Sequence, residues 1–166
     1  MKTTMLLSKI SICLLLITTS CFSQEKDLKD HVLFYSSFDG NPSADIALGD
    51  SNIYTAKSYK EADKAIEGMN DPNVVLAKDE GLSGDAIHFK EAKTAAIFYK
   101  AYKNVGYNNI SWSGTISFWL RLDPNKALAP HYCDPICITD SKWSDAGLWV
   151  DFTDHNPRQF RYGAMG

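Results

Sequence analysis

The chain has 166 residues, with 17 Lys and Arg against 20 Asp and Glu, and aromatic residues form 12% of it. This length predicts a single domain, and a mildly acidic chain without a basic stripe argues against nucleic acid and anionic membrane surfaces as partners. Most of the aromatic residues fall in strand-like runs, which favours an all-β protein.

The first 23 residues have the pattern of a secretory signal peptide. Lys2 and Lys9 come before an apolar run from Ile10 to Ile17, and no acidic residue occurs before Glu25. A charged start, a short apolar middle and small residues at the exit are typical of such signals. The apolar run is too short to span a membrane, which needs about 20 apolar residues. We therefore expect an exported protein, in the periplasm, outside the cell or at the cell surface.

Two processing routes fit this signal. Signal peptidase would cut after Ser23, whereas a lipobox would place a lipid anchor on Cys21. Lipoboxes usually carry an aliphatic residue where this chain has Thr18, so we favour the simple cut. Residues 24–30 then form a polar leader, and residues 31–166 form the domain.

Strand-like segments follow at short intervals through the domain. The first, His31–Phe38, is apolar on both faces and is followed by the turn residues 39–42. In the irregular stretch after it, Tyr59–Met69 is expected to form a short helix. The later predicted strands are Asn73–Ala77, Ala86–Phe89, Thr94–Tyr99, Ser113–Asp123, Asp134–Thr139, Gly147–Thr153 and Gln159–Met165. Short strands separated by turns, without helices between them, predict an antiparallel sandwich or barrel.

The clearest alternation lies in Ser113–Asp123, SGTISFWLRLD. Its apolar residues, at every second position from Ile116 to Leu122, point one way, whereas Trp119 and Arg121 point the other way. This pattern predicts a strand with one oily face and one mixed face, which we expect the other strands to pair around.

Two cysteines of the domain lie four residues apart, in HYCDPICITD. On a straight strand the Cα atoms of Cys133 and Cys137 would be about 13 Å apart, too far for a disulfide. A turn at Asp134-Pro135 would bring them together, so a loop disulfide and two unpaired thiols both stay open. A zinc site would need two more ligands, and His131 alone does not supply them.

Three stretches together carry a resemblance: FYSSFDG at 34–40, GLSGDAIHF at 81–89 and WSGTISFWLRLDP at 112–124. In this order they resemble the concanavalin A-like lectin/glucanase superfamily, and specifically the laminin-G-like jelly-roll domains of secreted bacterial proteins. The resemblance implies a two-sheet antiparallel β-sandwich with a concave sheet. The later segment that closes the sandwich in that family does not occur here, and the sequence stops at Gly166 directly after a predicted strand. We therefore expect a jelly roll that is incomplete at its C-terminus, in the front portion of a longer protein.

This fold serves lectins, hydrolases and adhesion modules, so it does not imply one function. Hydrolases of the superfamily carry paired carboxylates on one strand, in an E-x-D-x-x-E pattern, placed as acid and nucleophile. The nearest match here has Asp151 and Thr153 on one face, but Asp154 points away and no Glu accompanies them. His155 lies beside Asp154, but no Ser or Cys of the sequence lies in a nucleophile-elbow motif that would make this pair part of a catalytic triad. The sequence leaves enzymatic activity open and favours a module without it.

A binding face has better support. On Gly147–Thr153 and Gln159–Met165 the alternation points one set of polar and aromatic residues away from the core, as it does on Ser113–Asp123. If the three strands are neighbours, the candidate ligand-binding residues are Trp119, Arg121, Trp149, Asp151 and Arg161. Indole rings stack on the apolar faces of sugars, and Arg and Asp pair with sugar hydroxyls.

Calcium is the other binding chemistry to weigh. Asp39, Asp45 and Asp50 with a few carbonyl groups would make an oxygen cage, but their spacing matches no fixed calcium loop. A turn-forming role is the better interpretation of Asp39 and Asp50. The sequence leaves a metal undecided.

These observations favour a secreted, non-catalytic module that binds a polysaccharide or glycoconjugate. Two alternatives stay open. One is a glycan-active hydrolase whose catalytic residues lie beyond Gly166. The other is a structural or adhesion domain of the cell envelope.

Overall fold

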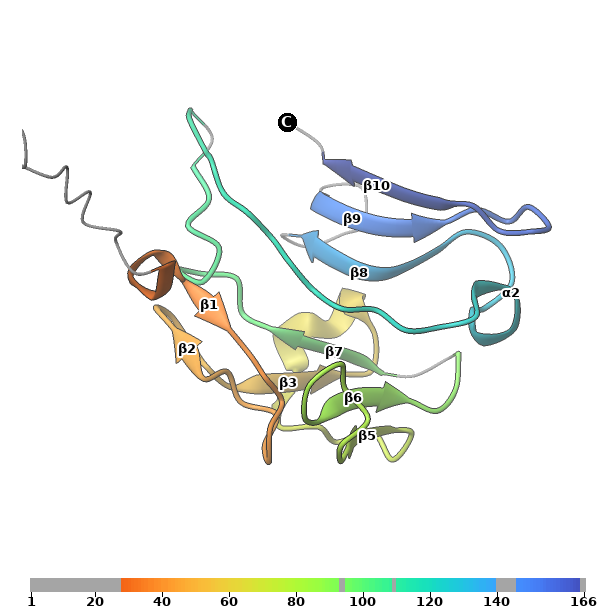
Figure 1. The fold of residues 1–166 in the computed structure, drawn as a ribbon, viewed down its shortest axis with the longest axis horizontal. Coiled ribbons are helices and arrows are strands. Elements are labelled where there is room, and N and C mark those ends of the chain that lie inside the picture. The colour runs from red at the N-terminus through yellow and green to blue at the C-terminus, as the bar shows by residue number, and fades with distance from the viewer. Residues whose placement is uncertain (1–27, 93–94, 109, 140–145, 165–166) are drawn as a thin grey trace, which may run out of the picture. The chain divides into compact units, whose positions relative to one another are not determined.

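The computed structural model describes residues 28–92, 95–108, 110–139 and 146–164 (Figure 1). The predicted signal peptide and the start of the polar leader lie outside these residues. The chain divides into two units, residues 1–31 and 32–166. The described residues of the first unit form η1 (Leu28–His31), a short 3-10 helix. In the described part of the chain, no helix is long and apolar enough to cross a membrane.

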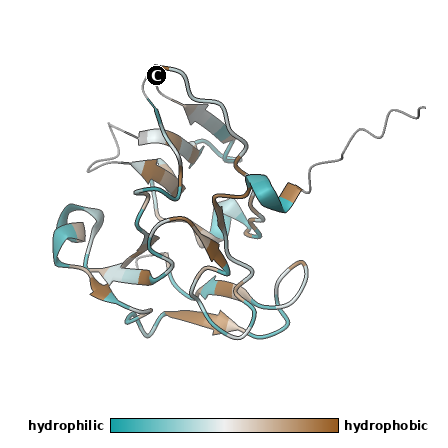
Figure 2. Cartoon of the chain, turned by 90° about the vertical axis from the view of Figure 1, so that its left-hand side faces the viewer, coloured by the Kyte–Doolittle hydropathy of each residue, from teal (hydrophilic) through white to brown (hydrophobic). Residues whose placement is uncertain are grey.

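The second unit is built mostly of β-strands, in agreement with the predicted all-β class. The strands are short and antiparallel, and the brown of apolar residues is concentrated on them in Figure 2. Their bounds are β1 (Phe34–Tyr35), β2 (Ile46–Ala47), β3 (Ile53–Ala56), β4 (Ile66–Glu67), β5 (Val74–Ala77), β6 (Ala86–Phe89), β7 (Ala96–Tyr99), β8 (Cys133–Thr139), β9 (Ala146–Phe152) and β10 (Phe160–Ala164). Two helical turns accompany them, η2 (Tyr59–Lys64) and α2 (Pro124–Ala127).

The strands form small sheets. β1 pairs with β2, β5 pairs with β6, β3 lies between β4 and β7, and β9 lies between β8 and β10. β9 is buried on both faces: Val150 is fully buried on one side and Asp151 on the other. A central strand that is covered on both faces is the most constrained position in a small sheet, because each of its side chains must find a partner.

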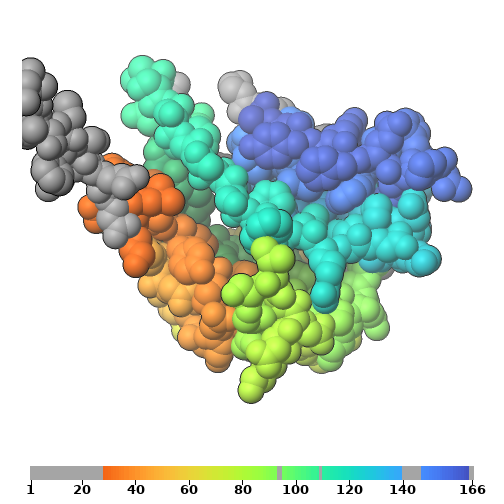
Figure 3. All heavy atoms as spheres, viewed as in Figure 1, coloured from red at the N-terminus to blue at the C-terminus, as the bar shows by residue number. Residues whose placement is uncertain are grey.

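The sequence predicted three elements differently. The predicted strand Ser113–Asp123 is an extended segment that belongs to none of the sheets of the described residues, and it is seen as a teal band across the surface in Figure 3. Its alternation survives only in part: Ile116 and Leu122 are half-buried and Trp119 is 80% exposed, but Phe118 and Leu120 on the predicted apolar face are also exposed, at 37% and 40%. Alternation specifies which side chains share a face, but not which strand supplies the hydrogen bonds.

The predicted helix Tyr59–Met69 is shorter and tighter than expected. It is the 3-10 helix η2, and the backbone turns extended at Ala65 (φ −63°, ψ 146°). β4 then pairs with β3, with Glu67 opposite Tyr54. The first strand is also shorter than predicted, since His31 lies in η1 and only Phe34–Tyr35 pair with β2. Local sequence favoured longer elements, and pairing with neighbouring strands overrode it.

Two of the stretches that carry the family resemblance are joined by a reciprocal pair of aspartates. Asp85 donates its backbone N–H to the carboxylate of Asp39 (2.8 Å), and Gly40 donates its N–H to the carboxylate of Asp85 (3.0 Å). Asp79 donates a third N–H to Asp85 (2.9 Å). These backbone bonds lower the pKa of Asp85. The turn after β1 is thereby fastened to the β5–β6 hairpin.

Gly84 is required for this junction. It has φ +71°, and a Cβ added there would run into the carboxylate of Asp39. Gly40 has a similar φ of +75°, but a Cβ added there would meet nothing within 4 Å.

We therefore expect Gly84→Ala to destabilise the protein by at least about 1 kcal/mol, and by more than Gly40→Ala, because both variants strain the backbone and only the first displaces Asp39. Urea unfolding of both variants measures the difference. Equal losses in the two variants would show that the Asp39–Asp85 junction is not closely packed around Gly84.

Candidate functional site

One face of the β8–β9–β10 sheet gathers polar and aromatic side chains. Arg161 of β10 lies opposite Asp151 of β9, and Gly163 lies opposite Trp149. Cys137 of β8 lies opposite Trp149 on the other side. Directly opposed residues of antiparallel strands point to the same face, so the ladder places the side chains of Arg161, Asp151, Trp149 and Cys137 on one surface, beside Gly163.

Asp151 and Arg161 form the charged centre of this face. The guanidinium of Arg161 contacts Oδ2 of Asp151 in an ion pair. Asp151 is 2% exposed, whereas about half of the Arg161 side chain is exposed. The guanidinium also lies over the ring of Tyr132, 5.0 Å from its centroid. Arg161 therefore contacts a buried charge on one side and an aromatic ring on another, while about half of its side chain stays exposed.

A β-bulge brings a second carboxyl group to Asp151. Cys133 pairs with Phe152 and Ile136 pairs with Val150, so Asp134 and Pro135 together lie opposite Asp151. Partial desolvation and the neighbouring charge of Asp151 raise the pKa of Asp134, although its side chain keeps exposed surface, and Arg161 opposes this shift.

Trp149 lies flat over the edge strand. A Cβ on Gly163 would run into the six-membered ring of the Trp149 indole. The absence of a side chain at Gly163 thus lets the indole cover the backbone of β10, and it leaves Trp149 half-buried. One edge of the ring is held in place while the rest of it borders the face that carries Arg161.

Arg158 covers this face from one end. Its guanidinium donates to the carbonyls of Ala129 (2.6 Å) and His131 (2.7 Å). These bonds hold the segment before β8 close to the sheet and place Tyr132 over Arg161. Asp151, which alternation predicts to point outward, is 2% exposed.

The structure brings together three of the five predicted site residues: Trp149, Asp151 and Arg161. Arg121 instead forms an exposed ion pair with Glu80, with 3.6 Å between its Nη2 and the carboxylate oxygen. Trp119, in the same extended segment, is 80% exposed. Both predicted indoles therefore keep accessible surface, as a sugar platform requires.

Sequence reasoning missed two members of the face, Tyr132 and Asp134. The signal for Asp134 was the Asp134-Pro135 pair, which we interpreted only as a turn. Proline inside a strand marks a bulge or an edge, and a bulge moves the residue beside it onto a new neighbour. Tyr132 carried no signal of its own, because the hydrogen bonds of Arg158 determine its position.

The cysteines of β8 do not form the loop disulfide that the sequence left open. Asp134-Pro135 makes a bulge within a continuous strand rather than a tight turn, and Cys133 is a free thiol. Burial raises the pKa of the Cys133 thiol, which disfavours the reactive thiolate.

The aspartates weighed as calcium ligands are engaged elsewhere. Asp45 accepts the N–H of Ser37 (2.6 Å), and this bond lowers its pKa. Asp50 accepts the N–H of Asn52 (2.9 Å) and the hydroxyl of Tyr54 (2.7 Å). Asp39 joins the Asp85 junction described above. Among the described residues, no group of three or more His, Cys, Asp or Glu side chains is placed to hold a metal ion.

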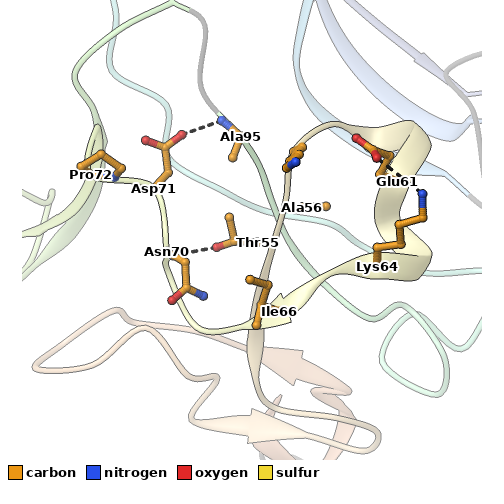
Figure 4. Close-up of a pocket in the computed structure, with 10 residues that line it drawn as sticks. Thr55, Ala56, Glu61, Lys64, Ile66, Asn70, Asp71, Pro72 and Ala95 are labelled. Atoms are coloured by element: carbon orange, nitrogen blue, oxygen red, sulfur yellow. Dashed lines mark hydrogen bonds and ion pairs between the residues drawn. The ribbon is translucent and has the colours of Figure 1, made fainter.

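A pocket of about 520 Å³ lies beside β3 and η2 (Figure 4). Two of its polar groups are already used: Asp71 accepts the N–H groups of Ala95 and Asn73, and Thr55 bonds Gly68 and Asn70. At its rim, Lys64 pairs with Glu61 (3.6 Å). These bonds maintain the local fold, so the β8–β9–β10 face is the stronger candidate.

Comparison of the chain with protein-family models, with curated proteins and with solved structures gives no match. The function must therefore be argued from the geometry of the site.

The two arginines provide a test of the site's architecture. Arg161→Ala leaves the buried charge of Asp151 without its cation, and we expect a loss of about 2–4 kcal/mol in the free energy of unfolding. Arg121→Ala breaks an ion pair between two exposed side chains, and we expect a loss of at most about 1 kcal/mol. Urea denaturation of both variants measures this. A loss for Arg161→Ala no greater than that for Arg121→Ala would contradict the burial of Asp151.

Proposed function

We propose that the chain is an exported, non-catalytic module that binds a polysaccharide or glycoconjugate. The observation that carries this proposal is Arg161, which is held by the buried Asp151 and the ring of Tyr132 while half of its side chain faces solvent. A guanidinium that is fixed before the ligand arrives loses little conformational freedom on binding. The N–H groups of this half-exposed guanidinium are suited to adjacent hydroxyl oxygens of a sugar ring.

Aromatic surface supports the same proposal. Tyr132 and Trp149 flank Arg161, and Trp119 offers a largely exposed indole on the extended segment. The apolar face of a sugar stacks on such rings, while its hydroxyl groups need charged or polar partners. The combination on one small sheet favours a carbohydrate over a purely apolar ligand.

We further propose that the domain is of the concanavalin A-like, laminin-G-like jelly-roll class. Two observations support this assignment: the antiparallel sheets of the second unit, and the Asp39–Asp85 junction that ties two of the three resembling stretches together. The signal-like residues 1–23 support export.

The carboxyl pair of this face does not favour a glycan hydrolase. Glycosidases need two carboxyl groups about 5 Å or more apart, with room for the scissile bond or a water molecule between them. The bulge places Asp134 directly opposite Asp151 on the neighbouring strand, and Asp151 is buried. This geometry is suited to holding a proton and an arginine in place rather than to cleaving a bond.

The proposal is tested by retention of the full chain on immobilised polysaccharides and on a glycan array. We expect Trp119→Ala to weaken retention by about tenfold or more, because an aromatic platform is a typical binding hot spot. Trp149→Ala should abolish it, provided circular dichroism shows an intact fold.

Tyr102→Ala is the matched control. Tyr102 is 79% exposed, nearly the same as Trp119, and it lies outside the site, so its removal should leave retention within about twofold. Retention that survives both tryptophan substitutions would overturn the proposed site. A chain that binds none of the glycans would favour a structural or adhesion role.

A further inference from the structure

The position of Asp134 opposite the buried Asp151 places two carboxyl groups beside one guanidinium. Oδ2 of Asp151 is satisfied by Arg161, but its buried Oδ1 has no hydrogen-bond donor among the described residues. The bulge in β8 places Asp134 opposite Asp151, so a second carboxyl group lies beside the orphaned oxygen. Two ionised carboxylates cannot form a hydrogen bond, because both are acceptors only.

The other charged and polar groups around Asp134 and Asp151 do not supply the missing hydrogen-bond donor or a second positive charge. From β10, Arg161 supplies one positive charge, and it is committed to Oδ2. From the loop before β10, Arg158 donates to backbone carbonyls. From β8 and the residue before it, Cys133 and Tyr132 contribute a buried thiol and an aromatic ring. One cation therefore faces two carboxyl groups, and an unpartnered buried oxygen is costly.

We infer that Asp134 holds a proton that it donates to the buried Oδ1 of Asp151, and that this shared proton positions the Asp151–Arg161 pair at the face of the sheet. The proton satisfies the orphaned oxygen and leaves one negative charge for the one guanidinium. Asp134 is itself exposed, so the proton exchanges with solvent. Asp134 is thus a positioning residue for Arg161, and its role in ligand recognition rests on the carbohydrate-binding function proposed above.

We expect the stability of the folded protein to fall as the pH rises. The raised pKa of Asp134 means that the folded protein binds this proton more tightly than the unfolded chain does. The stabilisation is complete at low pH and is lost as the pH rises through the raised pKa. Above that pH, two carboxylates repel each other and compete for Arg161, so the guanidinium is no longer held in one orientation.

The first experiment measures the protonation of the Asp134 carboxyl group directly and needs no ligand. In the full chain labelled with ¹³C at the aspartate carboxyl groups, we expect the Asp134 signal, assigned by its loss in Asp134→Asn, to titrate above the ordinary aspartate value of about 3.9. Asp134→Asn keeps a donor toward Oδ1 and cannot ionise, so its stability should not decline over the pH range in which the wild type loses stability. Asp154→Asn removes an exposed carboxylate outside the cluster and should keep the decline. A titration at or below the ordinary value, or a decline that persists in Asp134→Asn, would overturn the inference.

The second experiment reads the ligand, with whichever polysaccharide the retention test identifies as the probe. We expect the wild type to bind about tenfold more weakly above the titration midpoint of Asp134, and Asp134→Asn to bind equally on both sides of it. Asp134→Ala, which removes the donor, should bind weakly at every pH. A raised titration in a chain that retains no polysaccharide at any pH would overturn the proposed function and leave the shared proton standing. Ligand binding in the wild type that does not change across the midpoint would overturn the positioning role.

Discussion

The arrangement of the β8–β9–β10 sheet depends on one constraint: a carboxylate that is almost fully buried must have its charge and its oxygens satisfied. Asp151 lies in the central strand and is only 2% exposed. Arg161 satisfies one oxygen from the edge strand, and the bulge in β8 places Asp134 opposite Asp151. The position of Tyr132 and the outward presentation of Arg161 both follow from this burial. A buried pair of this kind adds little net stability, but it strongly penalises any arrangement that separates the partners.

In such a site the buried ion pair determines how the side chains are arranged and adds little to the stability of the fold. The guanidinium that would meet a sugar is oriented before the ligand arrives, by groups on three separate segments. Each of these groups is held by a partner of its own: Asp151 by the strand, Tyr132 by the bonds of Arg158, and Asp134 by the bulge. Preorganisation of this kind increases affinity by lowering the entropy that binding costs. It also makes the face sensitive to a single proton.

The sequence predicted the all-β class and the strands β9 and β10, together with the shared face of Trp149, Asp151 and Arg161. It predicted these because period-two spacing is a local property of one strand. It failed for Ser113–Asp123, where the same spacing occurs without a pairing partner among the described residues, since partners are determined by distant parts of the chain. It also failed for Asp134 and Tyr132. Their positions depend on a bulge and on the hydrogen bonds of Arg158, which no periodicity encodes.

Gly163 shows how narrowly one position on an edge strand can be restricted. Phe160 and Tyr162, its neighbours on β10, are more than half exposed and leave room for many replacements. Gly163 lies beneath the indole of Trp149, so even a methyl group there would lift the ring away from the sheet. Among related chains we would expect glycine at position 163 wherever position 149 is tryptophan. Where position 149 is a smaller residue, we would expect other residues at position 163. The two positions would then vary together through evolution, although neither forms a polar bond with the other.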